Sequence, residues 1–363
     1  MAKKMVTCEE VKPKILDSIN KNRIRAGQRL PSFRALAQEY GASIPTIQRA
    51  VSMLASEGRL TSRVGSGTYV TEQLHPTSKF VGVLLPYVAQ RTGNFMTDAF
   101  ISMRKVILEH GYFPVSVEPT PNTSGEVRDK EELALINKLV SQGMAGIIVD
   151  SCASEDSPIW SKLQQLNVPV LCFNNNGKGA GYLDSVSADN YRGGALAAER
   201  LLSANRKNVA VMSDPFDGSS SVRDRVRGFC ETMNAAGVTV NSDKIISLRN
   251  MTLNEKESSA EVVNRLKDVD GIFGINDGTA IRTMNLLTQA GKRIPKDVAI
   301  VGFDDSELCE HVSPRLDSVR QASSHMGQRA AELLLERIEN PDNRMDTIQL
   351  KTQVSLIIRD SVK

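Results

Sequence analysis

The sequence has few cysteines and histidines and no long apolar run. Its five cysteines are scattered and show no C-x-x-C spacing, so we expect reduced thiols in a cytoplasmic protein. Four histidines, with no pair at helical spacing, give a metal site little support. No apolar run reaches the roughly 18 residues of a membrane span, and no apolar segment follows the charged start as in a signal peptide. We therefore expect a cytoplasmic protein without a metal and without membrane contact.

Patterns of catalysis are missing as well. There is no G-x-S-x-G elbow and no Ser/His/Asp set with supporting context. Asp150 and the pair at 304–305 supply carboxylates of the kind that glycosidases use, but nothing in the sequence indicates a raised pKa or a suitable separation. A glycine-rich stretch, V-G-S-G-T-Y-V at 64–70, lacks the Lys-Ser/Thr pair and the following helix of a phosphate loop. We predict neither an enzyme nor a bound cofactor.

The 363 residues suggest two or three domains, and charge divides them unevenly. Residues 1–80 hold 13 Lys/Arg against 6 Asp/Glu, whereas residues 81–363 hold 32 against 36. A small basic segment joined to a larger, mildly acidic one favours a polyanion-binding module attached to another domain. The alternative is that the basic residues only form a solvated surface.

Three helices and a hairpin are predicted in the first 70 residues. Apolar spacing indicates a helix over 9–20, and Ser32 and Ser43 are good N-caps for two more, separated by a turn at Gly41. The stripe predicted to be buried on the third helix is Ile44, Ile47, Val51 and Leu54. The opposite face carries Thr46, Gln48, Arg49 and Ser52. Such a helix can enter the major groove, where Gln recognises adenine and Arg recognises guanine or holds phosphate. Two short strands follow, with G-S-G as the hairpin tip between them.

The motifs L-P-S-F-R, A-S-I-P-T-I-Q-R-A, E-G-R-L and G-S-G-T-Y-V, within residues 30–70, resemble the winged-helix DNA-binding domain of the GntR family of bacterial repressors. The resemblance implies that the third helix contacts base edges and that the hairpin is a wing in the minor groove. The implied DNA contacts are Arg34, Ser43, Thr46, Gln48 and Arg49, with Gly65, Ser66 and Gly67 at the wing. The family usually has Arg at the position of Ile44 and often at that of Gln48, so the operator sequence stays open.

From residue 80 onward, apolar strands alternate with helical segments, which is typical of α/β folds with parallel sheets. Some 280 residues favour two such lobes with a cleft between them. Ligands bind outside the carboxyl ends of the strands in these sheets. Asp, Asn and Arg side chains with an adjacent phenylalanine gather at the predicted strand ends, a composition suited to a sugar. The alternative is that these side chains are helix caps and turn residues.

Motifs of the second part resemble the effector domain of LacI/GalR repressors, which is similar to periplasmic sugar-binding proteins. They include V-G-V-L-L-P at 81–86, S-A-D-N-Y-R-G-G at 187–194 and I-P-K-D-V-A-I-V-G-F-D-D at 294–305. The predicted effector-binding residues are Asn94, Phe95, Asp150, Asn174, Arg225, Asn276 and Asp304. The family often has Asp at the position of Asn174, which leaves the ligand's identity open. The family's own DNA-binding head is replaced by a GntR-type head, as in arabinose-responsive repressors.

The predicted fold is thus α/β, an N-terminal winged helix-turn-helix (1–72), a linker (73–79) and a two-lobed periplasmic-binding-protein-like domain with parallel sheets (80–363). The resemblance puts lobe 1 at about 80–184 and 321–350, and lobe 2 at about 185–320 and 351–363. We predict a homodimeric repressor of carbohydrate-utilisation genes that a monosaccharide releases from a palindromic operator. A purine or phosphosugar effector, or an effector that promotes DNA binding, is the alternative.

Overall fold

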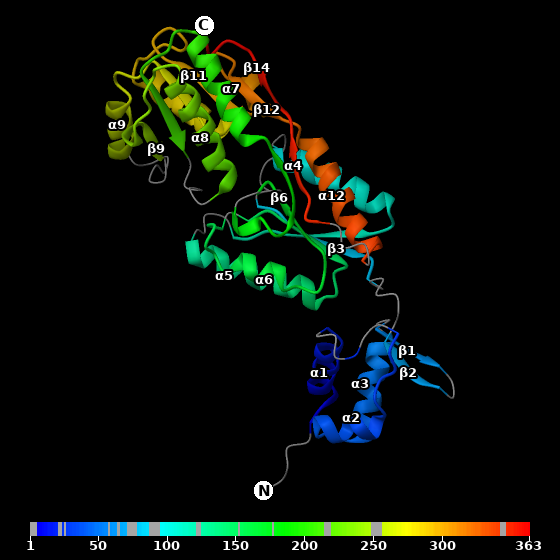
Figure 1. Cartoon of the computed structure of the whole chain (residues 1–363). Coiled ribbons are helices and arrows are strands. Elements are labelled where there is room, and N and C mark those ends of the chain that lie inside the picture. Colours follow the sequence, from blue (N-terminus) through cyan, green and yellow to red (C-terminus); the bar gives the residue numbers. More distant parts are fainter. Residues whose placement is uncertain are drawn as a thin grey trace. The chain divides into compact units, whose positions relative to one another are not determined.

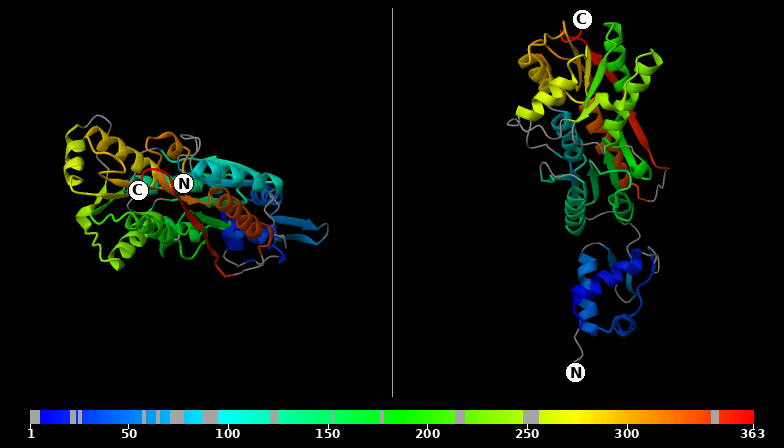
Figure 2. Two further views of the ribbon diagram at one scale, coloured as in Figure 1. Left: turned by 90° about the horizontal axis from the view of Figure 1, so that it is seen from above. Right: turned by 90° about the vertical axis from the view of Figure 1, so that its left-hand side faces the viewer.

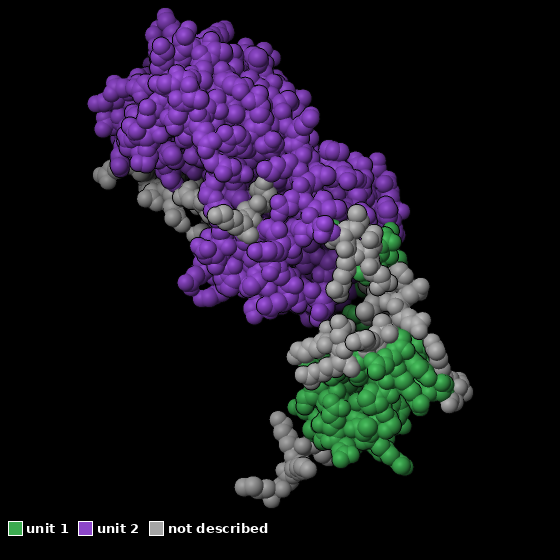
Figure 3. All heavy atoms as spheres, in the orientation of Figure 1, with its two compact units in different colours: residues 1–79, 337–344 green, residues 80–336, 345–363 purple. Residues whose placement is uncertain are grey.

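The computed structural model describes residues 6–20, 24, 27–56, 59–63, 66–70, 78–86, 95–120, 125–151, 153–175, 178–213, 219–247, 256–341 and 346–363. The chain divides into two compact units, residues 1–79 with 337–344 and residues 80–336 with 345–363 (Figure 3). Residues 1–79 are called the head below, and residues 80–363 the body. Within the described ranges, no helix is long and apolar enough to cross a membrane.

The head consists of three helices and a two-stranded hairpin that extends away from them (Figure 1). Its elements are α1 (Cys8–Asn20), α2 (Phe33–Tyr40), α3 (Ile44–Ser56), β1 (Leu60–Arg63) and β2 (Gly67–Val70). Fully buried side chains from all three helices, among them Ile15, Leu36, Ile47 and Leu54, form its core. The predicted stripe on α3 is wrong at one end, because Ile44 is 39% exposed and Ala50 is buried instead.

Local chemistry sets the helix ends of the head as predicted. The Ser32 hydroxyl accepts a hydrogen bond from the backbone N–H of Ala35, and Gly41 ends α2 in the left-handed conformation with a φ of 66°. The backbone N–H of Thr46 donates to the Ser43 hydroxyl at 3.2 Å, which caps α3. A tight glycine turn therefore joins α2 to α3, the arrangement of a helix-turn-helix.

The hairpin pairs β1 and β2 in antiparallel register, with Leu60 opposite Val70 and Arg63 opposite Gly67. Residues before α2 extend this small sheet, since Leu30 N–H donates to the Thr68 carbonyl oxygen and Val70 N–H donates to the Gln28 carbonyl oxygen. The sheet is thereby tied to the start of the helix-turn-helix.

The body has two lobes, each built on a six-stranded sheet. The first sheet has the strand order β13-β7-β6-β5-β3-β4, and all its pairs are parallel. Its strands are β3 (Phe80–Leu84), β4 (Phe113–Val117), β5 (Gly146–Val149), β6 (Val170–Phe173), β7 (Asp184–Ala188) and β13 (Gln349–Thr352). The helices of this lobe are α4 (Phe95–Glu109), α5 (Gly125–Ser141), α6 (Ile159–Gln164), η1 (Lys178–Ala180) and α12 (Ser323–Glu339).

The second sheet has the order β14-β12-β11-β10-β8-β9, parallel except that β14 runs antiparallel to β12. Its strands are β8 (Val209–Ser213), β9 (Ile245–Ser247), β10 (Gly271–Gly274), β11 (Ala299–Asp304), β12 (Asp317–Gln321) and β14 (Val354–Ile357). The helices of this lobe are α7 (Asn190–Ser203), α8 (Ser220–Ala235), η2 (Ser242–Lys244), α9 (Lys256–Arg265), α10 (Asp277–Gln289) and α11 (Leu308–His311). Figure 2 shows, in two further views, the helices that pack around the strands of the body.

The predicted fold class is confirmed, a helix-turn-helix followed by α/β lobes with parallel sheets. The boundaries between lobes differ slightly from the expectation. The chain leaves the first sheet only after Ala188, because β7 pairs with β6 and β13, whereas a boundary at 184–185 was expected. It crosses back after Gln321 and again between Thr352 and Val354. Three crossings therefore connect the lobes.

Two glycines let α7 and α8 touch backbone to backbone. A methyl group added at Gly194 would lie 2.0 Å from the carbonyl oxygen of Arg225, and one at Gly228 would lie 2.0 Å from that of Tyr191. No side chain larger than hydrogen fits at either position without a shift of the helices. This close crossing fixes the part of α8 that carries Arg225.

Candidate DNA-binding and effector sites

One face of α3 is exposed and mostly polar. Its exposed residues follow helical spacing and are Ile44, Pro45, Gln48, Arg49 and Ser52. Thr46, predicted to lie on this face, is only half exposed, and its hydroxyl lies 2.7 Å from the Ser43 hydroxyl. Arg34 is exposed on the first turn of α2. The exposed face predicted for α3 therefore lacked Ile44, and Thr46 is less exposed than predicted.

The tip of the hairpin is held by Tyr69, whose phenolic oxygen lies 2.7 Å from the Ser66 hydroxyl. Gly67 has a φ of 114°, and a methyl group there would lie 2.6 Å from Nε of Arg29. A cationic side chain that the sequence analysis did not select thus lies against the hairpin. The predicted wing residue Gly65 lies outside the described residues.

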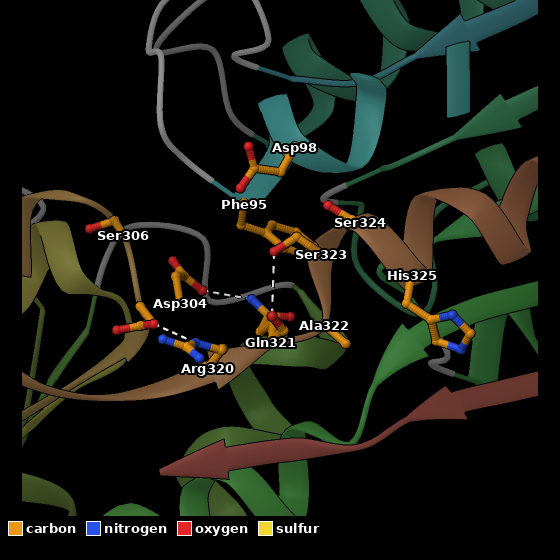
Figure 4. Close-up of a pocket in the computed structure, with 11 residues that line it drawn as sticks. Phe95, Asp98, Asp304, Ser306, Arg320, Gln321, Ala322, Ser323, Ser324 and His325 are labelled. Carbon is orange, nitrogen blue, oxygen red and sulfur yellow. Dashed lines mark hydrogen bonds and ion pairs between the residues drawn. The ribbon is translucent and has the colours of Figure 1, made fainter. Parts of the chain in front are cut away.

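In the body, a cavity of about 380 Å³ lies between the lobes (Figure 4), within the range of small-molecule sites. Residues at the carboxyl ends of β11 and β12 line one side, and the first turns of α4 and α12 line the other. The lining residues are Phe95, Asp98, Asp304, Asp305, Ser306, Arg320, Gln321, Ala322, Ser323, Ser324 and His325. Most of these side chains bear carboxylate, hydroxyl, amide or cationic groups.

Asp304, which was predicted to bind the effector, lines this cavity and is held by a hydrogen bond and an ion pair. Its Oδ1 accepts a hydrogen bond from Nε2 of Gln321 at 2.6 Å, and the guanidinium of Arg225 lies 3.5 Å away. Burial raises the pKa of the Asp304 carboxyl, and the nearby Arg225 charge opposes this effect. The backbone of Asp304 has a φ of 110°, a conformation that non-glycine residues rarely adopt. Strained backbone of this kind is concentrated at ligand sites.

Arg225 is buried beneath Asp304 and does not itself line the cavity. Its guanidinium donates to Oδ1 of Asn190 at 2.8 Å and to the carbonyl oxygen of Ile275 at 2.7 Å, and it lies 3.6 Å above the Phe303 ring. Burial lowers the pKa of Arg225, and the Asp304 and Asp277 carboxylates oppose that shift. Arg225 therefore holds the Asp304 carboxylate in place.

Of the other predicted effector residues, only Phe95 lies in the cavity with Asp304 among those that the structure describes. Phe95 lines the cavity and stacks on Phe173 with ring centroids 5.9 Å apart. Asn276 accepts a hydrogen bond from Thr279 N–H and caps α10, the alternative role that the sequence analysis left open. Asn174 does not line the cavity, and Asn94 lies outside the described residues.

Asp150 is buried at the end of β5 and is not among the residues that line the cavity. Burial, followed by the nearby Glu132 carboxylate, raises its pKa to about 7. Glu132 is itself fully buried, accepts from Nε of Arg128 at 2.6 Å and accepts from the Ser151 hydroxyl. Asp150, which was predicted to contact the effector, thus lies in a buried polar cluster of the first lobe.

Gln321 and Asp98 line the cavity but were not predicted from the sequence. Gln321 ends β12, where the chain crosses back to the first lobe, and Asp98 is in the first turn of α4. Burial raises the pKa of Asp98. Gln321 is the last residue of β12, a short strand that was not predicted from the sequence.

Polar contacts also join the two lobes outside the cavity. The Ser220 hydroxyl at the start of α8 donates to Oδ1 of Asn175 at 2.8 Å. Nη2 of Arg223, one turn further along α8, lies 2.7 Å from Oε1 of Glu155. Both contacts connect the start of α8 to the loops after β5 and β6.

The exposed face of α3 and the interlobe cavity are thus the candidate DNA-binding and small-molecule sites of the head and the body. Residues 7–70 match the model for bacterial regulatory proteins of the gntR family, and residues 198–362 match that for a periplasmic binding protein-like domain. The chain therefore combines a GntR-type helix-turn-helix domain with a periplasmic-binding-protein-like domain, as the sequence motifs predicted.

Similar curated proteins are transcriptional regulators. The arabinose metabolism transcriptional repressor of Geobacillus stearothermophilus is 25% identical over 98% of this chain and 97% of that protein. The regulator CelR of Thermobifida fusca is 29% identical over 61% of this chain and 65% of that protein. The repressor PurR of Vibrio vulnificus is 26% identical over 79% of this chain and 82% of that protein.

Solved structures agree on the fold. A transcriptional regulator CelR in complex with cellobiose matches 92% of this chain and all of that chain, with a TM-score of 0.69 and 22% identity. A LacI family transcriptional regulator from Enterococcus faecalis V583, with bound ribose, matches 78% of this chain and 98% of that chain. Its TM-score is 0.62 and its identity 28%.

Proposed function

We propose that this chain is a sequence-specific transcriptional repressor of carbohydrate-utilisation genes that a small sugar releases from its operator. The observation that carries the proposal is the presence, in one chain, of a GntR-type helix-turn-helix and an interlobe cavity lined mainly by polar groups. The similarity to the arabinose repressor, which extends over both parts, supports the same conclusion.

The head binds DNA through α3 and the hairpin. Gln48 and Arg49, both exposed on α3, contact base edges or phosphates in the major groove. Arg34 and the backbone around Ser66 and Gly67 contact the DNA backbone, and Arg29 adds a cation beside the hairpin. Lysine and arginine contacts with phosphate make such binding strongly dependent on salt.

The body binds a monosaccharide in the interlobe cavity. Sugar hydroxyl groups both donate and accept hydrogen bonds, which Asp304, Gln321 and Asp98 can satisfy, while Phe95 offers an apolar ring. The ribose-bound and cellobiose-bound structures of similar fold contain ligands of this chemistry. A purine or a phosphosugar is the alternative effector class to test. The site binds and releases its ligand without converting it.

A homodimer presents two heads to the two halves of a palindromic operator, about one helical turn apart. The effector binds both lobes, changes their relative angle and thereby the spacing of the heads. Because the target is chromosomal DNA, the protein works in the cytoplasm. Release on effector binding requires only a modest coupling free energy, about 1–3 kcal/mol.

The proposal is tested by two measurements on the full-length protein. A thermal-shift screen of pentoses, hexoses, phosphosugars and purines identifies the effector, because a ligand that binds only the folded state raises the melting temperature. Selection from random duplex DNA identifies the operator. Recovery of a palindromic sequence and stabilisation by a monosaccharide are expected. Failure to enrich any duplex would refute DNA recognition, and stabilisation by a purine alone would replace the sugar.

A further inference from the structure

Ile44 is an exposed apolar side chain on the otherwise polar face of α3. It is 39% exposed, whereas Ile47 and Ala50 of the same helix are fully buried in the head core. Gln48, one turn further along the same face, is also exposed. Ile44 therefore contributes little to the head core and projects at the first residue of the helix.

A single exposed apolar side chain is ordinary on a protein surface. Ile44 differs from such residues because it is the first residue of α3. The N-terminal residues of the second helix of a helix-turn-helix contact base edges in the major groove. Isoleucine has no hydrogen-bond donor or acceptor in its side chain. The apolar group that base pairs display in the major groove is the C5 methyl group of thymine.

We propose that Ile44 contacts the methyl group of one thymine in each operator half-site and so determines sequence preference at that position. The inference rests on the proposed DNA-binding function and adds a specific contact to it. The neighbouring hydroxyls of Ser43 and Thr46 lie 2.7 Å from each other, and Ser43 also caps the helix. Ile44 is the first residue of α3, is exposed and has no polar group to satisfy by a local bond.

The test removes the methyl group from the DNA. In the selected operator, each thymine is replaced in turn by deoxyuridine, which lacks only the C5 methyl group. At one position in each half-site, replacement is expected to weaken binding of the wild-type protein roughly fourfold, the equivalent of about 0.8 kcal/mol for one buried methyl-sized group. Fluorescence anisotropy at fixed salt concentration measures the affinities.

Variants connect that methyl group to Ile44. Ile44→Ala keeps a good helix former outside the core and is expected to bind the thymine and deoxyuridine operators equally well. Ile44→Arg is expected to shift the preference at the same position toward guanine. Gln38→Ala, an exposed change on α2, serves as the matched control and retains the methyl dependence. Thermal unfolding of each variant checks that the head folds.

The outcomes separate this inference from the proposed function. A selected operator that binds equally well with deoxyuridine at every thymine would overturn the contact and leave DNA recognition intact. An Ile44→Ala variant with the full methyl dependence would assign the contact to another residue. If no duplex is selected at all, the proposed function fails and this contact fails with it.

Discussion

Nη1 of Arg225 lies 3.5 Å from Oδ1 of Asp304, and the same guanidinium lies 3.6 Å above the Phe303 ring. Arg225 is buried, whereas Asp304 faces the interlobe cavity. The pair therefore connects the interior of the second lobe to the ligand site. Removal of either partner from a buried pair leaves the charge of the other uncompensated, so thermal unfolding must check the fold of any variant at these two positions. Asp304 is the better position for testing the ligand because it lines the cavity, and after its replacement Arg225 keeps its bonds to Asn190 and to the Ile275 carbonyl oxygen.

Asp304→Asn is expected to weaken effector binding at least tenfold, because it replaces a charged acceptor with a neutral amide at the centre of the cavity. Operator affinity in the absence of effector is expected to stay unchanged. Isothermal titration calorimetry and anisotropy measure the two affinities. The matched control is Glu307→Gln, which makes the same chemical change at an exposed residue near the cavity. Equal effector affinity in wild type and Asp304→Asn would remove Asp304 from the site.

Gln321→Ala removes the amide that donates to Asp304 and lines the cavity. We expect effector affinity to fall by roughly five- to a hundredfold, the equivalent of about 1–3 kcal/mol for a buried hydrogen-bonding group left without its partner. Gln321→Glu is expected to weaken binding further, since it places a second carboxyl group against Asp304. If calorimetry gives unchanged affinity for both variants, the cavity is not the effector site.

Gly194→Ala tests the close contact between α7 and α8. The added methyl group would lie 2.0 Å from the Arg225 carbonyl oxygen, so the helices must separate. We expect the body to lose at least about 2 kcal/mol of unfolding free energy in urea. Gly237→Ala is the control, because its φ of 77° causes backbone strain while the added methyl group meets open space, and it costs only about 1 kcal/mol. Equal losses for the two variants would contradict the steric argument.

Asp150→Asn tests the buried cluster of the first lobe. Because burial raises the pKa of Asp150 to about 7, the folded state retains a proton that the unfolded state releases above its ordinary pKa of about 4. The stability contributed by this group is therefore present at low pH and is lost as pH rises through 7. Relative to wild type, Asp150→Asn should gain stability between pH 5 and pH 8. Urea unfolding at the two pH values measures the change, and a constant difference would contradict the assignment.

Gly67→Val tests the hairpin. A β-branched residue is strained at a φ of 114°, and its Cβ would displace the Arg29 side chain. We expect operator affinity to fall by roughly five- to a hundredfold, while effector binding to the body stays at its wild-type value. A variant that binds the operator normally would remove the hairpin and Arg29 from the DNA interface.

Much of the fold could be predicted from the sequence because its signals are local. The caps at Ser32 and Ser43 and the left-handed turn at Gly41 depend on residues close in the chain. Apolar runs such as those of β8 and β10 indicate strands that are buried on both faces of a sheet. The exposure of Ile44 could not be predicted, because its spacing suits both the buried stripe and the opposite edge at the first turn of a helix.

The effector site was harder to predict because its residues come from two segments far apart in the sequence, residues 95–98 and residues 304–325. Asp304 was recognisable at the end of an apolar strand, but Gln321 is the last residue of a strand that mixes charged and polar residues. Asp150 and Asn276 occupy strand ends as well, and only the folded chain distinguishes a buried cluster or a helix cap from a cavity wall.

In the proposed function, a sugar bound in the body controls DNA binding by the head. The most direct measurement is operator affinity of the full-length protein, by fluorescence anisotropy at fixed salt, with and without the monosaccharide found in the thermal-shift screen. Saturating sugar is expected to weaken operator binding by about 5- to 150-fold, and Asp304→Asn is expected to abolish the effect at the same sugar concentration. Operator affinity that is identical with and without a sugar known to be bound would contradict the proposed function.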